Sequence, residues 1–168
     1  MPKRLKDRWR PESIREFWAA ARLRYNDGLA LAGQNRRTGA IYMWGYSAEM
    51  ALKAACFSLT LGDTIPITWG SHIHPAIHRG RTVHQIAWPN QGAGHNVRAW
   101  AELVVAEHAA RPGREFDPDT ARQLQICGQR VGQLWSETLR YHNNIAYLFE
   151  VTQVRQATEW LLANLPST

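Results

Sequence analysis

The sequence is poor in cysteine and in long apolar runs, and each shortage excludes a class of protein. Only two cysteines, Cys56 and Cys127, occur in 168 residues, and without CxxC spacing they form neither a zinc ribbon nor a secreted disulfide framework. We expect both to be reduced core residues. No apolar run approaches the ~20 residues that span a bilayer, and none follows the basic N-terminal residues as in a signal peptide. We therefore expect a cytoplasmic protein with no membrane partner.

Lysine is also scarce, although the chain is basic. The net charge is +6, and only three of the 20 cationic residues are lysines, so 17 are arginines. The planar guanidinium group binds phosphate through two hydrogen bonds and stacks on bases, which favours a nucleic-acid or nucleotide ligand. A genome of high GC content also replaces lysine with arginine, and these arginines are scattered along the chain. Both explanations stay open on charge alone.

The remaining composition is that of a single folded domain covering residues 1–168. Hydrophobic residues make up 45% of the chain and charged residues 20%, which excludes disordered and low-complexity proteins. No linker divides the sequence, and its length is sufficient for one core. The eight tryptophans exceed what such a core readily hides, so we expect a homodimer.

Apolar residues recur at helical spacing through most of the chain, and this predicts an all-α fold. One segment is apolar on several faces, as is typical of a helix at the centre of a bundle. Asp117 followed by Pro118 predicts another helix start, because Asp caps a helix and proline suits its first position. We expect an antiparallel bundle of four to five helices, with helices over residues 14–33, 40–61, 97–110, 118–141 and 147–165.

An irregular insertion over residues 62–94 interrupts this pattern between the second and third helices. Three prolines and five glycines punctuate it, and four of the seven histidines lie there within thirteen residues. Such a cluster is typical of transition-metal sites. No Cys, Asp or Glu lies between Gly70 and Pro89 to complete a metal site. A metal-dependent hydrolase that uses these histidines is therefore only an alternative function, and a solvated loop is the simpler explanation of the cluster. We predict no metal and no cofactor; the four histidines are His72, His74, His78 and His84.

A polar stripe marks the second predicted helix. Successive spacings of four, three and four residues place its members on one helix face. A purely structural explanation is available, because glutamate four residues before lysine forms a favourable pair and tyrosines commonly pack at helix contacts. The stripe consists of Tyr42, Tyr46, Glu49 and Lys53.

The segment RRTGAIYMWGYSAEMALKA, residues 36–54, resembles the second-helix signature of the HEPN superfamily. That signature has a Tyr-x-x-Glu segment followed by Leu-Lys. Residues 94–103 (GHNVRAWAEL) resemble the start of the family's third helix, and residues 139–144 (LRYHNN) resemble the Arg-Tyr that ends its fourth. The matching residues of the second helix are Tyr42, Tyr46, Glu49, Leu52 and Lys53.

The resemblance implies a small helical domain, usually dimeric, that is encoded beside nucleotidyltransferases or acts in RNA cleavage, toxin–antitoxin systems and defence against phage. We therefore expect it to bind RNA or nucleotide phosphates, with a nucleotidyltransferase as a possible partner. Arg140, Lys53 and Tyr141 are the expected phosphate-binding residues. A dimeric interaction protein without chemistry is a further alternative. The expected supporting residues are Tyr42, Tyr46, Glu49 and His95.

The sequence departs from the ribonucleases of that superfamily, which carry Arg-x(4–6)-His near the start of the last long helix. Here the candidate catalytic residues are Arg140 and His142, separated by one residue. On a continuous helix their side chains would diverge by about 200 degrees. We therefore predict weak or no ribonuclease activity. Arg140 has the simpler interpretation of a cation at a helix C-terminus.

Two other histidines bear on cleavage. A formal match to the motif occurs at Arg79 and His84, but it lies in the insertion and receives little weight. Catalysis would require the chain to leave the helix at Tyr141, or His84 or His95 to reach the site from outside.

Overall fold

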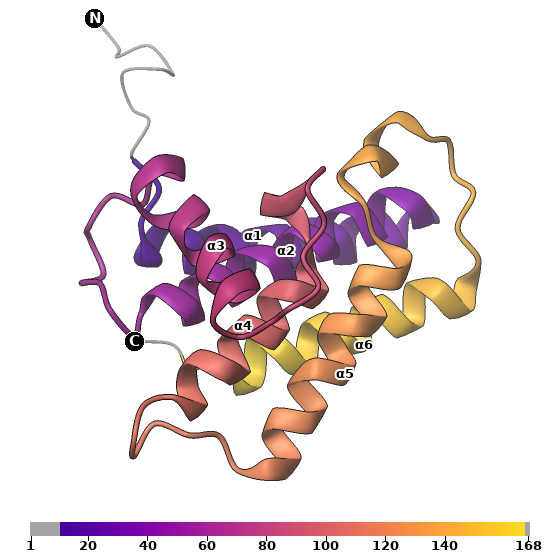
Figure 1. Cartoon of the computed structure of the whole chain (residues 1–168). Helices are drawn as coiled ribbons and strands as arrows, with labels where there is room; N and C mark the ends of the chain where they lie inside the picture. Colours follow the sequence, from indigo (N-terminus) through magenta and orange to yellow (C-terminus); the bar gives the residue numbers. More distant parts are fainter. Residues whose placement is uncertain (1–10, 167–168) are drawn as a thin grey trace, which may run out of the picture.

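The structure, a computed structural model, describes residues 11–166 and is helical throughout that range, with no strand (Figure 1). This confirms the all-α prediction. Three short helical turns join the α-helices: the π-helical η2 (Trp69–Ile73) and the 3₁₀ turns η3 (Ala93–His95) and η4 (Glu137–Tyr141). The α-helices are α1 (Ile14–Gly33), α2 (Arg37–Phe57), α3 (His74–Thr82), α4 (Val97–Ala109), α5 (Pro118–Leu134) and α6 (Leu148–Asn164).

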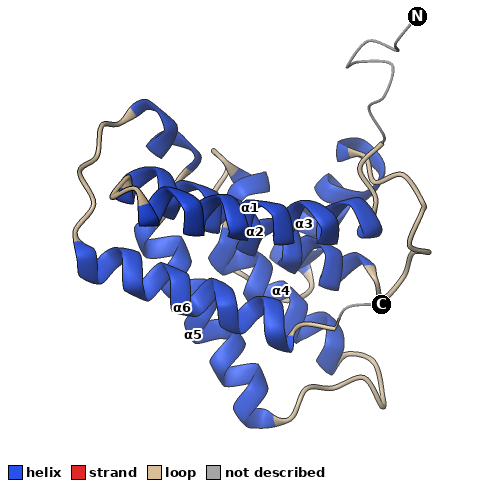
Figure 2. Cartoon of the chain, turned by 180° about the vertical axis from the view of Figure 1, so that it is seen from behind, coloured by secondary structure: helices blue, strands red, loops and turns tan. Residues whose placement is uncertain are grey.

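Helix α2 is the centre of the packing. It contacts α1, α4, α5 and α6, and Figure 2 shows α1 lying along it. Fifteen of its 21 residues are buried, including Trp44 and Leu52, which are fully enclosed. The prediction of a central helix, apolar on several faces, is confirmed, although the helix ends at Phe57 rather than near Leu61.

Side-chain caps fix the starts of three helices where the sequence predicted them. Ser13 accepts a hydrogen bond from the backbone N–H of Glu16 at the start of α1. Asn96 and Asp117 cap α4 and α5 in the same way, three residues before their backbone donors. Each cap satisfies an N–H that the first turn of a helix leaves without an intrahelical partner.

The expectation that residues 62–94 are irregular throughout is wrong, because they contain η2 and α3. Pro75 lies in the first turn of α3, where its missing N–H is harmless and its fixed φ favours a helix. Ala76 and Ile77 are buried, so α3 has an apolar face. Pro75 therefore starts a helix here and does not interrupt one.

The expectation that one helix runs from residue 118 to Tyr141 is also wrong, because α5 ends at Leu134. Trp135 has extended backbone angles, and its indole Nε1 donates a hydrogen bond to the carbonyl oxygen of Tyr42 at 3.1 Å. Its ring occupies the space where a side chain at Gly45 would lie. Ser136 then begins η4 by accepting a hydrogen bond from the backbone N–H of Thr138. A tertiary contact with α2 thus ends α5.

The two cysteines, Cys56 and Cys127, are unpaired and buried, as expected. Burial raises the pKa of the Cys56 thiol to about 12, which keeps it protonated. No helix within residues 11–166 is long and apolar enough to cross a membrane.

One chain buries more of its tryptophans than we expected from their number. Trp69 is exposed and Trp160 partly buried, while Trp9 lies outside the described residues. The tryptophan content therefore does not by itself require a second copy of the chain. The five that the core of one chain buries are Trp18, Trp44, Trp88, Trp100 and Trp135.

Candidate phosphate-binding site

The polar stripe of α2 is continuous with residues from two distant segments. Tyr42, Tyr46, Glu49 and Lys53 follow one another along the helix, as the sequence predicted. The turn η3 brings His95 to the Glu49 end, and η4 brings Arg140 to the Tyr42 end. The structure thus gathers six of the predicted site residues along one line.

Glu49 and Lys53 form a buried ion pair at the inner end of the stripe. Their exposed fractions are 3% and 7%, and Lys53 Nζ lies 2.5 Å from Glu49 Oε1. The ammonium group also lies 5.6 Å from the ring centroid of Trp100, a cation–π distance. A buried charge requires such partners, since desolvation is otherwise costly. Lys53 therefore faces Glu49 and an indole ring, and its charge is neutralised locally.

His95 binds the second carboxylate oxygen of Glu49. Its Nδ1 lies 3.0 Å from Glu49 Oε2, and its side chain is 40% exposed. The hydrogen bond to the carboxylate raises the pKa of His95 above its usual value, against the opposing effect of burial. The pair resembles a carboxylate-oriented imidazole of the kind used in acid–base catalysis.

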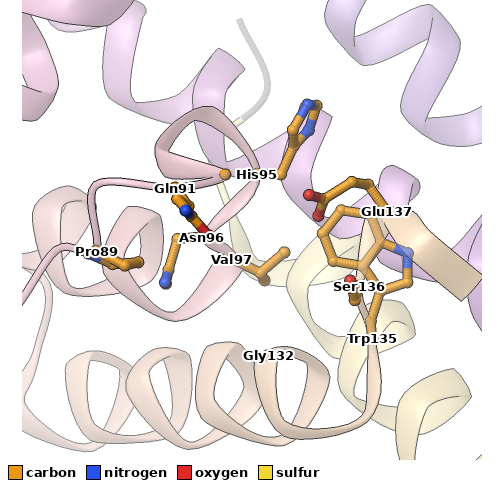
Figure 3. A pocket seen from close by; sticks show the side chains of 10 residues that line it. Pro89, Gln91, His95, Asn96, Val97, Gly132, Trp135, Ser136 and Glu137 are labelled. Carbon is orange, nitrogen blue, oxygen red and sulfur yellow. The ribbon is translucent and has the colours of Figure 1, made fainter.

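His95 opens onto a pocket of about 260 Å³ between η3, α4 and the end of α5. Figure 3 shows His95 and the Glu137 carboxylate toward the same side of this pocket, with Trp135 beside them. The negative charge of Glu137 further raises the pKa of His95. Because the carboxylate of Glu137 lines this pocket and would repel an anion, the pocket is poorly suited to binding phosphate.

Tyr46 connects the two ends of the stripe. Its ring packs edge-to-face on Tyr42, Trp135 and His95, with centroid distances of 5.0, 5.2 and 6.1 Å. Burial, and then a hydrogen bond with Tyr42, raise the pKa of Tyr46 well above its usual value, so the phenol stays protonated. Tyr46 is therefore a packed, uncharged bridge between the Glu49 group and the Tyr42 end of the stripe.

A second pocket, of about 520 Å³, lies between the first turn of α2 and the chain that follows α5. Arg140 and His142 both line it, and Arg36 lines it from the other side. The divergence of about 200 degrees expected on a continuous helix does not apply, because the chain there is a 3₁₀ turn followed by an extended residue. The other residues that line this pocket are Leu31, Thr38, Gly39, Tyr42, Met43, Leu139, Asn143 and Asn144.

Arg140 interacts with two tyrosines. Its Cζ lies 4.7 Å from the ring centroid of Tyr141, and side-chain hydrogen bonds with Tyr141 and Tyr42 raise the pKa of the guanidinium group. The side chain remains exposed. Its planar charge is thus oriented but still accessible to a ligand.

Hydrogen bonds across the pocket fix its rim. The Asn144 side chain accepts from the backbone N–H of Thr38 at 3.1 Å and donates to the carbonyl oxygen of Asn35 at 2.7 Å. The Thr38 hydroxyl accepts from the backbone N–H groups of Ile145 and Ala146. The segment after η4 is therefore tied to the first turn of α2. Arg36, Thr38 and Asn144 were not among the residues predicted from the sequence, although the Asn143–Asn144 pair is a local signal for this turn.

Arg79 and His84, which have the Arg-x(4)-His spacing, both contact the carboxylate of Glu107. Arg79 Nε lies 2.5 Å and His84 Nε2 lies 3.0 Å from Oε1 of the buried Glu107, whose other oxygen binds Arg111. Burial opposes ionisation of Glu107, but hydrogen bonds from Arg111 and His84 and the charge of Arg79 lower its pKa below the usual value. The polar atoms of Arg79 and His84 thus tie α3 and its following turn to α4.

The other histidines of residues 62–94 do not converge. His72 Nδ1 accepts a hydrogen bond from the backbone N–H of Thr68, while His74 and His78 are exposed on α3. Among residues 11–166, no three His, Cys, Asp or Glu side chains are grouped so that they could hold a metal ion. The metal-dependent hydrolase considered above has no ligand set in that range.

Comparisons of the chain with protein-family models, curated proteins and solved structures found no match. The function must therefore be inferred from the geometry of the site.

Proposed function

We propose that this domain binds phosphate groups of RNA or of a nucleotide in the pocket between α2 and η4. The observation that carries the proposal is the convergence of Arg36 and Arg140 on a pocket with no Asp or Glu in its lining. A guanidinium group matches the geometry of phosphate oxygens and binds them through paired hydrogen bonds. The net charge of +6 would also attract a polyanion.

Two features of the surroundings support this assignment. The pocket lies at the N-terminal end of α2, where the helix dipole favours negative charge. Arg140 also lies against the ring of Tyr141, with Cζ 4.7 Å from the ring centroid, and this contact favours one orientation of the guanidinium group. A side chain already held in place loses less conformational entropy when it binds.

In this proposal Lys53 acts indirectly. Its ammonium group is buried against Glu49, so it fixes the Glu49 carboxylate rather than contacting phosphate. Tyr42, Tyr46 and His95 complete the support, and Tyr141 orients Arg140 directly.

We further propose that the domain is HEPN-like, an antiparallel bundle with residues 62–94 inserted. The support is that the residues carrying the resemblance, from Tyr42 to Lys53, lie in one stripe with His95 and Arg140. A homodimer, a nucleotidyltransferase partner and a role in a toxin–antitoxin or defence system are the accompanying proposals. Sedimentation of the purified protein at micromolar concentrations tests the first of these.

The test of the proposed function is a binding titration followed by fluorescence anisotropy. Arg140→Ala and Arg36→Ala should each weaken binding of a labelled RNA by about tenfold, since each removes charge-assisted hydrogen bonds to phosphate. Added salt should weaken the wild type as well. Arg122→Ala is the matched control, because Arg122 is exposed on α5 and does not line the pocket. Equal losses in all three variants would show a general charge effect and contradict the proposed site.

A further inference from the structure

The segment after Arg140 carries an unusual amount of exposed apolar surface. Of the ten large hydrophobic side chains that are exposed within residues 11–166, five lie between residues 141 and 149. Scattered exposed apolar residues are ordinary, but a concentration of this kind marks a binding surface. The five, each between 60% and 73% exposed, are Tyr141, Ile145, Tyr147, Leu148 and Phe149.

Two of these side chains form a flat aromatic pair. The rings of Tyr147 and Phe149 are stacked, with planes 9° apart and centroids 6.0 Å apart. The backbone before the pair is held by two hydrogen bonds: the Tyr147 N–H donates to Glu150 Oε2 at 2.7 Å, and the preceding Ala146 N–H donates to the Thr38 hydroxyl at 3.0 Å. Phe149 itself lies in the first turn of α6. The pair is thus presented to solvent by a fixed backbone.

This aromatic pair adjoins the proposed phosphate pocket. A smaller pocket of about 270 Å³ includes Tyr147 in its lining and shares Thr38 and Leu139 with the pocket that holds Arg140. Figure 1 shows the connection from α5 to α6, which carries Leu139, Arg140 and Tyr147, at the edge of the molecule. The pocket that Arg36 and Arg140 line and the pocket that Tyr147 lines are therefore adjacent.

We propose that Tyr147 and Phe149 form a base-stacking platform, and that the ligand of this site is a single-stranded nucleic acid. The inference rests on the proposed function, because it takes the phosphates to lie at Arg36 and Arg140. Aromatic rings bind unpaired bases by stacking, whereas the bases of a duplex are already stacked on each other and are not available. The arginines of the adjoining pocket and the net charge of +6 favour this polyanion over an apolar face of a second copy of the chain. The one carboxylate that lines the smaller pocket, that of Glu150, accepts a hydrogen bond from the backbone N–H of Tyr147.

The experiment compares three ligands of equal length with the wild type and a double variant, Tyr147→Leu with Phe149→Leu. The ligands are a single-stranded oligouridylate, an abasic phosphoribose oligomer and an RNA duplex. We expect the wild type to prefer the oligouridylate over the abasic oligomer. The double variant should lose about 5- to 150-fold in affinity for the oligouridylate, as stacking measurements on other proteins indicate. It should bind the abasic oligomer as the wild type does.

The outcomes separate the two proposals. If the double variant keeps the preference for bases, or if the wild type binds all three ligands equally, the platform is wrong and phosphate binding stands. If the wild type binds none of them, the proposed function fails, and the platform with it. If the double substitution instead converts a dimer into a monomer in sedimentation, the aromatic surface is an interface between copies and the platform is wrong.

A control variant addresses the chemistry of the rings. Tyr147→Phe with Phe149→Tyr keeps both rings and should bind the oligouridylate as the wild type does. Because both side chains are exposed, circular dichroism and thermal unfolding should be unchanged in all variants.

Discussion

The imidazole of His95 binds the carboxylate of Glu49 at 3.0 Å, although the two residues are 46 positions apart in the chain. The other oxygen of the same carboxylate binds Lys53, four residues along the helix. One buried carboxylate therefore joins η3 to the centre of α2. The arrangement makes Glu49 the residue whose substitution should have the widest effects.

Glu49→Gln should lower the pKa of His95. The hydrogen bond to Glu49 raises this pKa in the folded protein, so the interaction stabilises the fold most at pH values below about 6.5, the unperturbed histidine value. That stabilisation is lost as the pH rises through the raised pKa. NMR titration of the imidazole resonances measures the shift, and the remaining histidines are internal controls. An unchanged His95 titration in the variant would contradict the assignment.

Breaking the buried ion pair should destabilise the protein strongly. Glu49→Gln leaves Lys53 charged and buried, which costs on the order of 3–5 kcal/mol in the free energy of unfolding measured with urea. The double variant Glu49→Leu with Lys53→Met should be less destabilised, because it leaves no unpaired charge.

The exposed pair of Arg98 and Glu102 provides the control for this prediction. Glu102→Gln should change the free energy of unfolding by no more than about 1 kcal/mol. A comparable loss at both pairs would show that burial does not determine the effect.

Gly45→Ala should destabilise the protein by about 1–3 kcal/mol, because the added methyl group overlaps the ring of Trp135. The displaced ring would shift η4, so RNA binding through Arg140 should weaken too. Gly33→Ala is the control, since nothing lies near its Cβ position at the end of α1. Thermal unfolding and the anisotropy assay measure the two effects. Unaltered RNA binding in a destabilised Gly45→Ala protein would mean that Trp135 does not position Arg140.

Purified protein should cleave RNA weakly or not at all in EDTA. His142 lines the same pocket as Arg140, but that pocket contains no carboxylate to orient its imidazole. His95, which has such a partner, lines the other pocket. Single-stranded and structured RNA should be incubated with the wild type, His142→Ala and His84→Ala. Robust cleavage by the wild type that either substitution abolishes would overturn this prediction and identify the catalytic histidine.

Much of the site was predictable because its members share one helix. The spacing of Tyr42, Tyr46, Glu49 and Lys53 fixes their common face for any sequence that forms this helix. Arg140 and His95 were expected from the resemblance, but their distances to that face depend on how separate segments pack. Arg36 was missed because nothing in local spacing connects it with Arg140.

The sequence by itself determined the all-α fold, the central place of α2 and the starts of α1, α4 and α5, because periodicity and local start signals act within a few residues. Only the tertiary structure decided where α5 ends. Trp135 gains burial against Gly45 and a hydrogen bond to the Tyr42 carbonyl, and these contacts outweigh the local preference to continue the helix. Because the helix ends there, Arg140 and His142 line the same pocket. On a continuous helix the two side chains would lie on different faces.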